Sequence, residues 1–253
     1  MNDRIFVAGA TGAVGKRLVP LLVGAGYTVI GTTRFQEKAG SLASAGAQPV
    51  VVDVFDATAL SQAMRAAHPH IVIHQLTDLP HNLFGLETSR RAEALTRNAR
   101  IRSEGTRNLV TAAIGAGANH LIAQSIAWIY APGPEPHSED DPLDVPAEST
   151  SAVSVNGVLA LEKLTLESPP LIGTVLRYGM LYGPGTGRDA PAGSPALHVD
   201  AAALAAVLAA RSHRSGVFNI AEWNPHVATE KARRELGWDA AFRVAPNFAE
   251  ARR

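Results

Sequence analysis

Three glycines spaced three residues apart follow an apolar segment near the start of the sequence. Residues 5–8 predict a buried strand and residues 13–24 an amphipathic helix, with the glycines in the turn between them. Such a turn lets the chain reverse tightly, brings backbone amides close to a ligand and lets the helix pack against the sheet. Backbone N–H groups at a helix N-terminus bind phosphate. The sequence therefore predicts a pyrophosphate site of a dinucleotide, and the alternative is a glycine-rich turn without a ligand. The predicted residues are Gly9, Thr11, Gly12, Ala13, Val14 and Gly15.

Basic residues follow the second predicted strand, 28–32. The position that would carry an aspartate for a ribose 2′-hydroxyl is not acidic, and Arg34 and Lys38 come next. A guanidinium can pair with phosphate through two hydrogen bonds and can stack on adenine. We therefore expect NADP rather than NAD as the cofactor, with Arg34 and Lys38 at its 2′-phosphate. The alternative is that Arg34 is an ordinary solvated arginine.

The ends of the third and fourth predicted strands supply further cofactor contacts. Asp53 closes the third strand, where its carboxylate could accept a hydrogen bond from the adenine amino group while Val54 packs on the ring. An equally simple role for Asp53 is to cap the next helix. Gln75 and Leu76 end the fourth strand and should approach the ribose on the nicotinamide side.

Composition limits the classes of function. The chain has 253 residues, 46% of them hydrophobic, and equal numbers of basic and acidic residues, 23 each. Zero net charge gives no general attraction to nucleic acid, so a small-molecule substrate is the expected partner. The absence of cysteine excludes disulfides and thiolate chemistry. No metal site is expected, because His68, His70 and His81 lack carboxylates at ligand spacing. We expect a cytoplasmic protein, since no apolar run reaches membrane-spanning length and a strand begins within four residues of Met1.

Apolar runs alternate with helical patterns along the whole chain, which predicts an α/β fold with a doubly wound parallel sheet of the Rossmann type. The expected strands are 5–8, 28–32, 49–53, 71–76, 120–124, 173–177 and 217–220. The expected helices are 13–24, 37–45, 57–66, 87–116, 153–167, 200–211 and 229–236. Residues 1–253 should therefore form a single domain.

Three segments interrupt this alternation. Residues 131–151 and 183–195 are rich in Pro, Gly, Ser and acidic residues, and each follows the carboxyl end of a strand, where ligands bind in open α/β sheets. Together with the C-terminal segment 224–253 they are expected to form a small, shortened substrate lobe. The alternative is that both segments are surface loops that take no part in function.

Several motifs match one protein family. They are Gly-Thr-Arg-Asn-Leu at 105–109, Gln-Ser-Ile-Ala-Trp-Ile-Tyr at 124–130 and Leu-Arg-Tyr-Gly-Met-Leu-Tyr-Gly-Pro-Gly at 176–185. With the glycine turn, they make the chain resemble an extended or atypical short-chain dehydrogenase/reductase of the NAD-dependent epimerase/dehydratase group over essentially its whole length. The resemblance implies a Rossmann core that binds NAD(P), with substrate held against the nicotinamide. It also implies a possible homodimer through the arginine-rich helix 87–107, whose arginines we interpret as an exposed face.

The chain departs from this family at the residues that transfer protons. The family carries a Tyr-x-x-x-Lys pair on one helix, and none of the four lysines of this chain follows a tyrosine by four residues. Aligning on Glu162 puts Ser154 at the tyrosine position and Val158 at the lysine position. Lys163 cannot substitute, because five residues along a helix turn a side chain about 140° away.

Two residues remain as catalytic candidates. Ser125 ends the fifth strand, where the resemblance implies a substrate-orienting Ser or Thr; a shift of one residue would put Ile126 there instead. Tyr130 is the remaining candidate acid, and Arg177 is the nearest plausible source of the positive charge that would lower its pKa. The alternative for Tyr130 is a packing role.

These observations lead to three hypotheses. The first is an NADP-dependent oxidoreductase or isomerase that acts on a small carbonyl or hydroxyl metabolite with an atypical proton donor. The second is a dehydratase, cyclase or epimerase-like enzyme of the same fold without net hydride transfer. The third is a non-catalytic NAD(P)-binding sensor similar to the NmrA-like regulators, in which an intact glycine turn accompanies an active helix without its usual pair.

Overall fold

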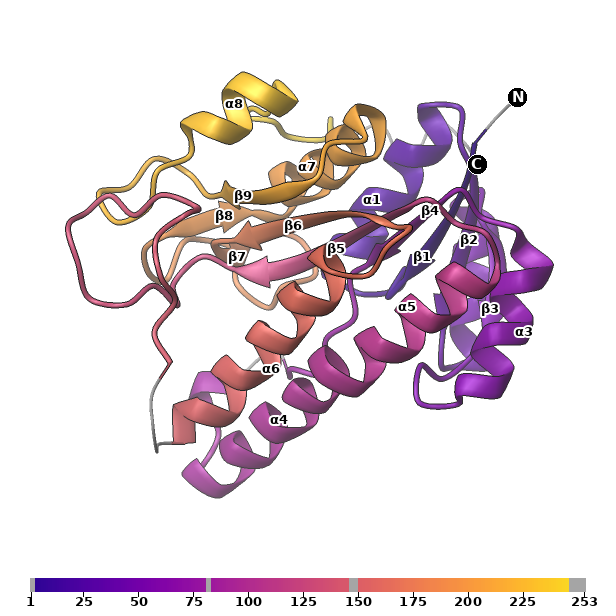
Figure 1. The fold of residues 1–253 in the computed structure, drawn as a ribbon, viewed down its shortest axis with the longest axis horizontal. Helices are drawn as coiled ribbons and strands as arrows, with labels where there is room; N and C mark the ends of the chain where they lie inside the picture. The colour runs from indigo at the N-terminus through magenta and orange to yellow at the C-terminus, as the bar shows by residue number, and fades with distance from the viewer. Residues whose placement is uncertain (1–2, 81–82, 146–149, 246–253) are drawn as a thin grey trace.

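A seven-stranded parallel sheet forms the centre of the molecule (Figure 1). The computed structural model describes residues 3–80, 83–145 and 150–245. The strands are β1 (Arg4–Ala8), β2 (Thr28–Thr33), β3 (Gln48–Val51), β4 (Ile71–His74), β5 (His120–Ile126), β6 (Ile172–Tyr178) and β9 (Gly216–Ile220). Their order across the sheet is β3-β2-β1-β4-β5-β6-β9, so the chain winds outward in both directions from β1 and β4. The predicted doubly wound sheet is confirmed.

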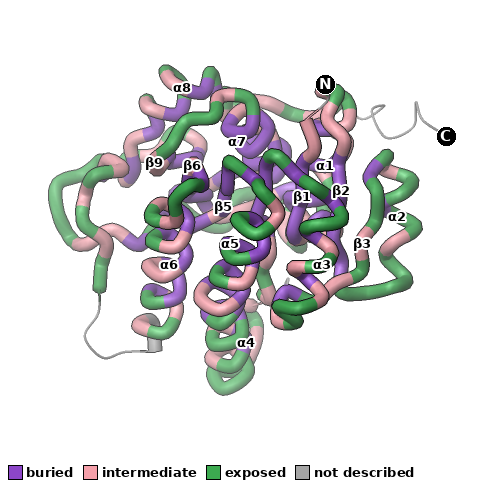
Figure 2. Tube along the Cα trace, turned by 45° about the vertical axis from the view of Figure 1, so that its right-hand side comes forward, coloured by how far each residue is buried: buried purple, intermediate pink, exposed green. Residues whose placement is uncertain are grey.

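Helices cover both faces of the sheet (Figure 1). On one face lie α1 (Ala13–Gly24), α7 (Val199–Ser212) and α8 (Glu230–Leu236), with the short α2 (Ala39–Ser44) near the β3 edge. The other face carries α3 (Ala57–Ala67), α4 (Thr88–Arg100), α5 (Thr106–Gly115) and α6 (Thr150–Leu166). Each face has its own apolar core. Figure 2 shows the central strands largely buried, while the outer part of α4 is exposed, and the edge strand β3 is mostly exposed as well.

The long helix predicted over 87–116 contains a break in its hydrogen-bond pattern. Between α4 and α5 lies a five-residue π-helical segment, Ile101–Gly105. A π segment rotates the side chains that follow it relative to a regular α-helix. Gly157 of α6 packs against this region, since a Cβ there would lie 2.9 Å from the Cα of Ala99. The π segment therefore sits where the helix presses against α6.

Strand β5 extends two residues beyond its predicted end. Ser125 pairs with Arg177 and Ile126 with Tyr178 in the ladder between β5 and β6. Strand β4 instead ends early, at His74, because Leu76 donates its N–H to His74 Nδ1 at 3.2 Å. These two ends decide which side chains reach the carboxyl edge of the sheet.

The segments outside the alternating pattern are organised by small pairings. Strands β7 (Met180–Tyr182) and β8 (Ala196–His198) form a two-stranded parallel sheet on either side of the loop 183–195. After α8, Trp238 is buried and its Nε1 donates to the carbonyl oxygen of Ala201 in α7 at 2.9 Å. This part of the C-terminal segment therefore packs on α7. The predicted segments 131–151 and 224–253 each run partly outside the described residues.

Residues 3–80, 83–145 and 150–245 contain no helix that is both long and apolar enough to cross a bilayer. Nor do they contain a group of three His, Cys, Asp or Glu side chains arranged to hold a metal ion. His81 lies outside these ranges.

Two histidines buried in the sheet predict a loss of stability in mild acid. His74 and His120 are fully buried, and burial lowers the pKa of each to about 4. The unfolded chain takes up these protons near pH 6.5, whereas the folded protein does not until about pH 4. Between these values the unfolded state binds more protons. The free energy of unfolding should therefore fall with decreasing pH, by up to about 1.4 kcal/mol per pH unit for each histidine.

Urea unfolding at several pH values from about 7 down to about 5 measures this slope above the range where carboxylates titrate. His120→Gln removes one of the two groups and should reduce the slope by about half. A free energy of unfolding that stays constant over this range would contradict the prediction.

Candidate functional site

The glycine turn between β1 and α1 has the shape that a pyrophosphate group requires. Gly9 has φ +89, and a Cβ there would lie 2.7 Å from the carbonyl carbon of Gln75. A Cβ at Gly15 would overlap the carbonyl group of Gly9, so the helix begins in direct contact with the turn. Gly12 is the N-cap of α1, and no side chain caps the helix. The first N–H groups of α1 are therefore available to phosphate oxygens, which fits a dinucleotide.

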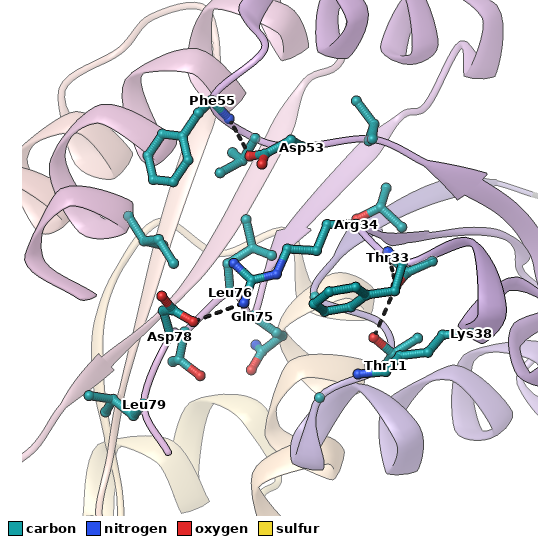
Figure 3. Close-up of a pocket in the computed structure, with 18 residues that line it drawn as sticks. Thr11, Thr33, Arg34, Lys38, Asp53, Phe55, Gln75, Leu76, Asp78 and Leu79 are labelled. Carbon is teal, nitrogen blue, oxygen red and sulfur yellow. Dashed lines mark hydrogen bonds and ion pairs between the residues drawn. The ribbon is translucent and has the colours of Figure 1, made fainter. Parts of the chain in front are cut away.

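A cavity of about 250 Å³ adjoins this turn at the carboxyl ends of β1 to β4 (Figure 3). Its wall includes all the predicted cofactor residues except Ala13, Val14 and Gly15, which form the first turn of α1. The lining residues are Gly9, Thr11, Gly12, Thr32, Thr33, Arg34, Phe35, Lys38, Val52, Asp53, Val54, Phe55, Gln75, Leu76, Thr77, Asp78, Leu79 and Ile101. The structure thus brings together residues from five separate parts of the sequence.

Arg34 lies across this cavity and is held by a carboxylate that the sequence reasoning missed. Its Nη2 donates to Asp78 Oδ1 at 2.9 Å (Figure 3). Asp78 also binds Arg97 at 3.1 Å. Arg34 and Lys38 each lie over the ring of Phe35, at 5.0 Å and 4.5 Å from its centre. Two cations therefore flank one aromatic ring at the cavity wall, and an anion bound to Arg34 would compete with Asp78.

Asp53 does not cap the following helix. Its Oδ1 accepts from the backbone N–H of Phe55 at 2.9 Å, which stabilises the turn after β3 (Figure 3). The cap of α3 is Asp56, whose side chain accepts from the N–H of Ala59. The capping alternative for Asp53 is therefore wrong, because the N-cap of α3 lies three residues further along the chain. Asp53 remains on the cavity wall.

A second cavity, of about 210 Å³, adjoins the first, since Thr77 and Leu79 line both. Most of its wall is apolar. It is lined by Thr77, Leu79, Leu83, Arg102, Gln124, Ser125, Ile126, Trp128, Tyr178, Gly179, Met180, Leu181, Arg188 and Ala192. Both alternatives for the fifth strand, Ser125 and Ile126, are on this wall. The position beside the dinucleotide cavity is where a substrate would meet the nicotinamide.

A buried ion pair lies directly behind Ser125. The Ser125 hydroxyl donates to Glu162 Oε1 at 2.6 Å. Arg177 binds both oxygens of the same carboxylate, with Nε at 3.0 Å from Oε1 and Nη2 at 2.7 Å from Oε2. A carboxylate paired in this way only accepts hydrogen bonds, so Ser125 must be the donor. The serine oxygen can therefore present only lone pairs to a ligand in the second cavity.

Tyr130 lies on the other side of this network from Ser125. Its hydroxyl donates to Asn219 Oδ1 at 2.6 Å and accepts from Arg177 Nη1 at 2.8 Å. Burial raises the pKa of the phenol and outweighs the opposing effect of Arg177, so the expected net lowering is wrong. Tyr130 lines a third cavity of about 230 Å³, where the three segments 131–151, 183–195 and 224–253 meet through residues that include His137, Pro195 and His226. The structure does not bring Tyr130 and Ser125 into one cavity.

The α6 positions assigned to proton transfer hold no acid that titrates near neutral pH. Val158 is fully buried and Ser154 is half-buried, while Lys163 is exposed. Glu162, one turn beyond Val158, is already bound by Ser125 and Arg177.

Arg102 is a site residue that the sequence reasoning misjudged. The arginines of 87–107 were expected on an exposed face, but Arg102 is only 9% exposed and lines the second cavity. It belongs to the π segment, which departs from the regular helix that the periodicity predicts. The family motif that begins with Gly105 and Thr106 locates this helix in the sequence. It gives no indication that residues 101–105 form a π segment.

The ion pair behind Ser125 predicts a large effect of neutralising Glu162. In the Glu162→Gln variant the Arg177 guanidinium stays buried without a counter-charge, and we expect a loss of about 3–5 kcal/mol in the free energy of unfolding. Glu167→Gln, an exposed position just after α6, should change it by less than about 0.5 kcal/mol. Urea unfolding of the three proteins measures both values. Equal stability of Glu162→Gln and the unmodified protein would contradict the structural role of the pair.

Comparisons with known proteins agree with this arrangement. Residues 5–238 match the model of the NAD dependent epimerase/dehydratase family. A curated Streptomyces protein, 3-diazoavenalumate denitrifying reductase, is 41% identical over 254 aligned positions, which cover 89% of this chain and 80% of the reductase.

Two solved structures share the fold. The Bordetella bronchiseptica enzyme WbmG, in complex with NAD, has a TM-score of 0.72 and 18% identity, covering 96% of this chain and 91% of that one. The UDP-glucose 4-epimerase of Thermotoga maritima, solved with UDP-glucose, has a TM-score of 0.72 and 19% identity, covering 95% and 94%. At these identities the likeness concerns the fold alone. Because the family model and the reductase both extend over most of the sequence, the chain belongs to the NAD dependent epimerase/dehydratase family and is an NAD(P)-dependent enzyme of the oxidoreductase/epimerase kind.

Proposed function

We propose that this protein is an NADPH-dependent reductase that removes a diazo group from a small organic compound as N2 and leaves hydrogen in its place. The observation that carries the proposal is the second cavity, where Ser125 is committed as a donor to Glu162 and the usual proton-transfer positions hold Ser154 and Val158. The relative at 41% identity bears the name of a diazo-removing reductase, which supports this choice of substrate class.

The balance of the reaction explains why the usual proton donor is dispensable. Reduction of a carbonyl requires a hydride at carbon and a proton at oxygen, and the proton must come from an acid. Reduction of a diazonium group requires only the hydride: the cationic –N2⁺ group and the hydride together give a C–H bond and neutral N2. No acid is consumed, so Ser154 and Val158 at the family's Tyr and Lys positions are compatible with turnover. The bound nicotinamide would supply the hydride.

The polarity of Ser125 supports the same substrate. Since its hydrogen is directed to Glu162, its oxygen offers lone pairs to the cavity. Lone pairs stabilise an electron-poor group such as a diazonium, whereas a carbonyl oxygen would need a donor at that place. The serine would therefore position the group that leaves rather than protonate it.

The choice of NADPH rests on the cations of the first cavity. Arg34 and Lys38 are the basic residues on its wall, beside the end of β2. A 2′-phosphate at Arg34 would replace the contact with Asp78 by a charge-assisted pair of hydrogen bonds.

The reaction itself is the first test. Purified protein with NADPH and 3-diazoavenalumate should oxidise one NADPH for each N2 released, measured by absorbance and by gas analysis. Ser125→Ala should lower kcat by about 10- to 100-fold without changing the affinity for NADPH. Reduction of carbonyl compounds with the diazo compound left intact would contradict the proposal. So would tight binding of NADPH without turnover of the diazo compound, which is the behaviour of a sensor.

Cofactor choice is tested by replacing Arg34. Arg34→Ala should raise the Kd for NADPH by about 10- to 100-fold while changing that for NADH by less than about threefold, because only NADPH carries the 2′-phosphate. Arg97→Ala is the matched control, since Arg97 also binds Asp78 but does not line the cavity. Fluorescence titration of the unmodified protein and both variants with each nucleotide gives the six dissociation constants. An equal loss of affinity for NADPH and NADH in Arg34→Ala would show that Arg34 does not bind the 2′-phosphate.

A further inference from the structure

Arg102 is a buried cation on the wall of the second cavity. Its side chain belongs to the π segment Ile101–Gly105, and only 9% of the residue is exposed. Burial lowers its pKa to about 10, so the guanidinium still carries its charge at neutral pH. A charge removed from water in this way is costly unless a partner compensates it.

No side chain within the described ranges compensates Arg102 through direct contact. Arg102 takes part in no hydrogen bond or ion pair there, in contrast to Arg177. The nearest carboxylate that favours its charge is Glu162, but both oxygens of Glu162 are engaged by Arg177 and one of them also by Ser125. His74, which also lies close enough to feel the charge, is kept neutral by burial.

The charge and polarity of the cavity wall also favour an anionic ligand. Its two charged residues, Arg102 and Arg188, are both arginines, and no carboxylate is among the described residues that line it. The rest of the wall is largely apolar, with Trp128 and Met180 among the larger side chains. A ligand that suits this cavity has an apolar body and one negatively charged group.

We infer that Arg102 is the residue that binds the anionic group of the substrate, a carboxylate on an apolar body. The planar guanidinium matches a carboxylate through two parallel hydrogen bonds. The phosphates of a dinucleotide are the less suitable partner, because the glycine turn that would hold them lines the first cavity and not the second. The inference rests on the proposed function only in placing the substrate in this cavity.

Arg102 and Ser125 then give the cavity wall two groups of opposite preference. The guanidinium attracts the carboxylate, and the lone pairs of Ser125 accommodate an electron-poor group on the same wall. A substrate with a carboxylate and a diazonium group would be oriented by both. Specificity would come from this orientation, since a wrongly turned molecule would place like charges together.

The test measures binding of an unreactive carboxylate, so that it does not depend on the diazo reaction. The probes are cinnamate and its uncharged amide, titrated calorimetrically into the protein with and without NADP⁺. The unmodified protein should bind cinnamate at least about tenfold more tightly than the amide. Arg102→Gln should weaken cinnamate binding by about 10- to 100-fold and leave the amide nearly unchanged. Arg102→Lys keeps the charge but not the planar fork, so its affinity for cinnamate should lie between those of the unmodified protein and Arg102→Gln.

Arg107→Gln is the matched control, because Arg107 lies five residues further along the same helical run and is exposed. It should bind both probes like the unmodified protein. The thermal midpoint of Arg102→Gln should equal or exceed that of the unmodified protein, since the change removes an uncompensated buried charge.

Three outcomes would overturn the inference. One is equal affinity for cinnamate and the amide, or no binding of cinnamate. Another is the same loss in Arg107→Gln as in Arg102→Gln, which would reflect net charge alone. The third is a marked drop in the thermal midpoint of Arg102→Gln, which would assign the arginine a structural role. Success here together with failure of the diazo assay would leave the carboxylate site standing and reject only the proposed reaction.

Discussion

The buried ion pair between Glu162 and Arg177 is the interaction on which the site depends. Glu162 comes from α6 and Arg177 from β6, and the carboxylate also holds the hydroxyl of Ser125 on β5. The same guanidinium reaches the hydroxyl of Tyr130, which is bound in turn to Asn219 of β9. Because a charge of either sign left alone at this depth would be strongly unfavourable, helix and strands must keep their relative positions. The pair thereby sets the polarity of Ser125.

The use of Glu162 as a partner for Arg177 and Ser125 affects which chemistry α6 can perform. In relatives the active helix delivers a proton, whereas here the corresponding turn of α6 carries half-buried Ser154 and buried Val158. The carboxylate one turn later is used to hold Ser125 as a donor. The proposed reaction is compatible with a dinucleotide turn that lacks this pair, because its leaving group departs without a proton. The chemistry would thus be decided by the substrate's own reactivity and by its orientation.

Arg102 shows how a local change in helix geometry can place a charged side chain in a buried position. In a helix of uniform α geometry the arginines before Gly105 read as one solvated face. The π segment interrupts that geometry next to the contact between Gly157 and Ala99, and Arg102 lies within it on the cavity wall. Such segments cost helix stability, and their occurrence at functional sites is a general observation. Here the π segment places one of the two arginines on the wall of a largely apolar cavity.

The sequence by itself determined the fold class, the order of strands and helices, the position of the glycine turn and the absence of the Tyr-Lys pair. These features depend on residue type, periodicity and spacing, which are local properties of the chain. Tertiary structure alone decided that Asp78 holds Arg34, that Ser125 donates to Glu162, that Tyr130 opens on a different cavity and that Arg102 is buried. Each of these depends on a partner 20 or more residues away or on a helix distortion caused by packing. No local pattern carries such information, because the hydrogen-bond partner of a buried polar group is chosen by which elements meet in space.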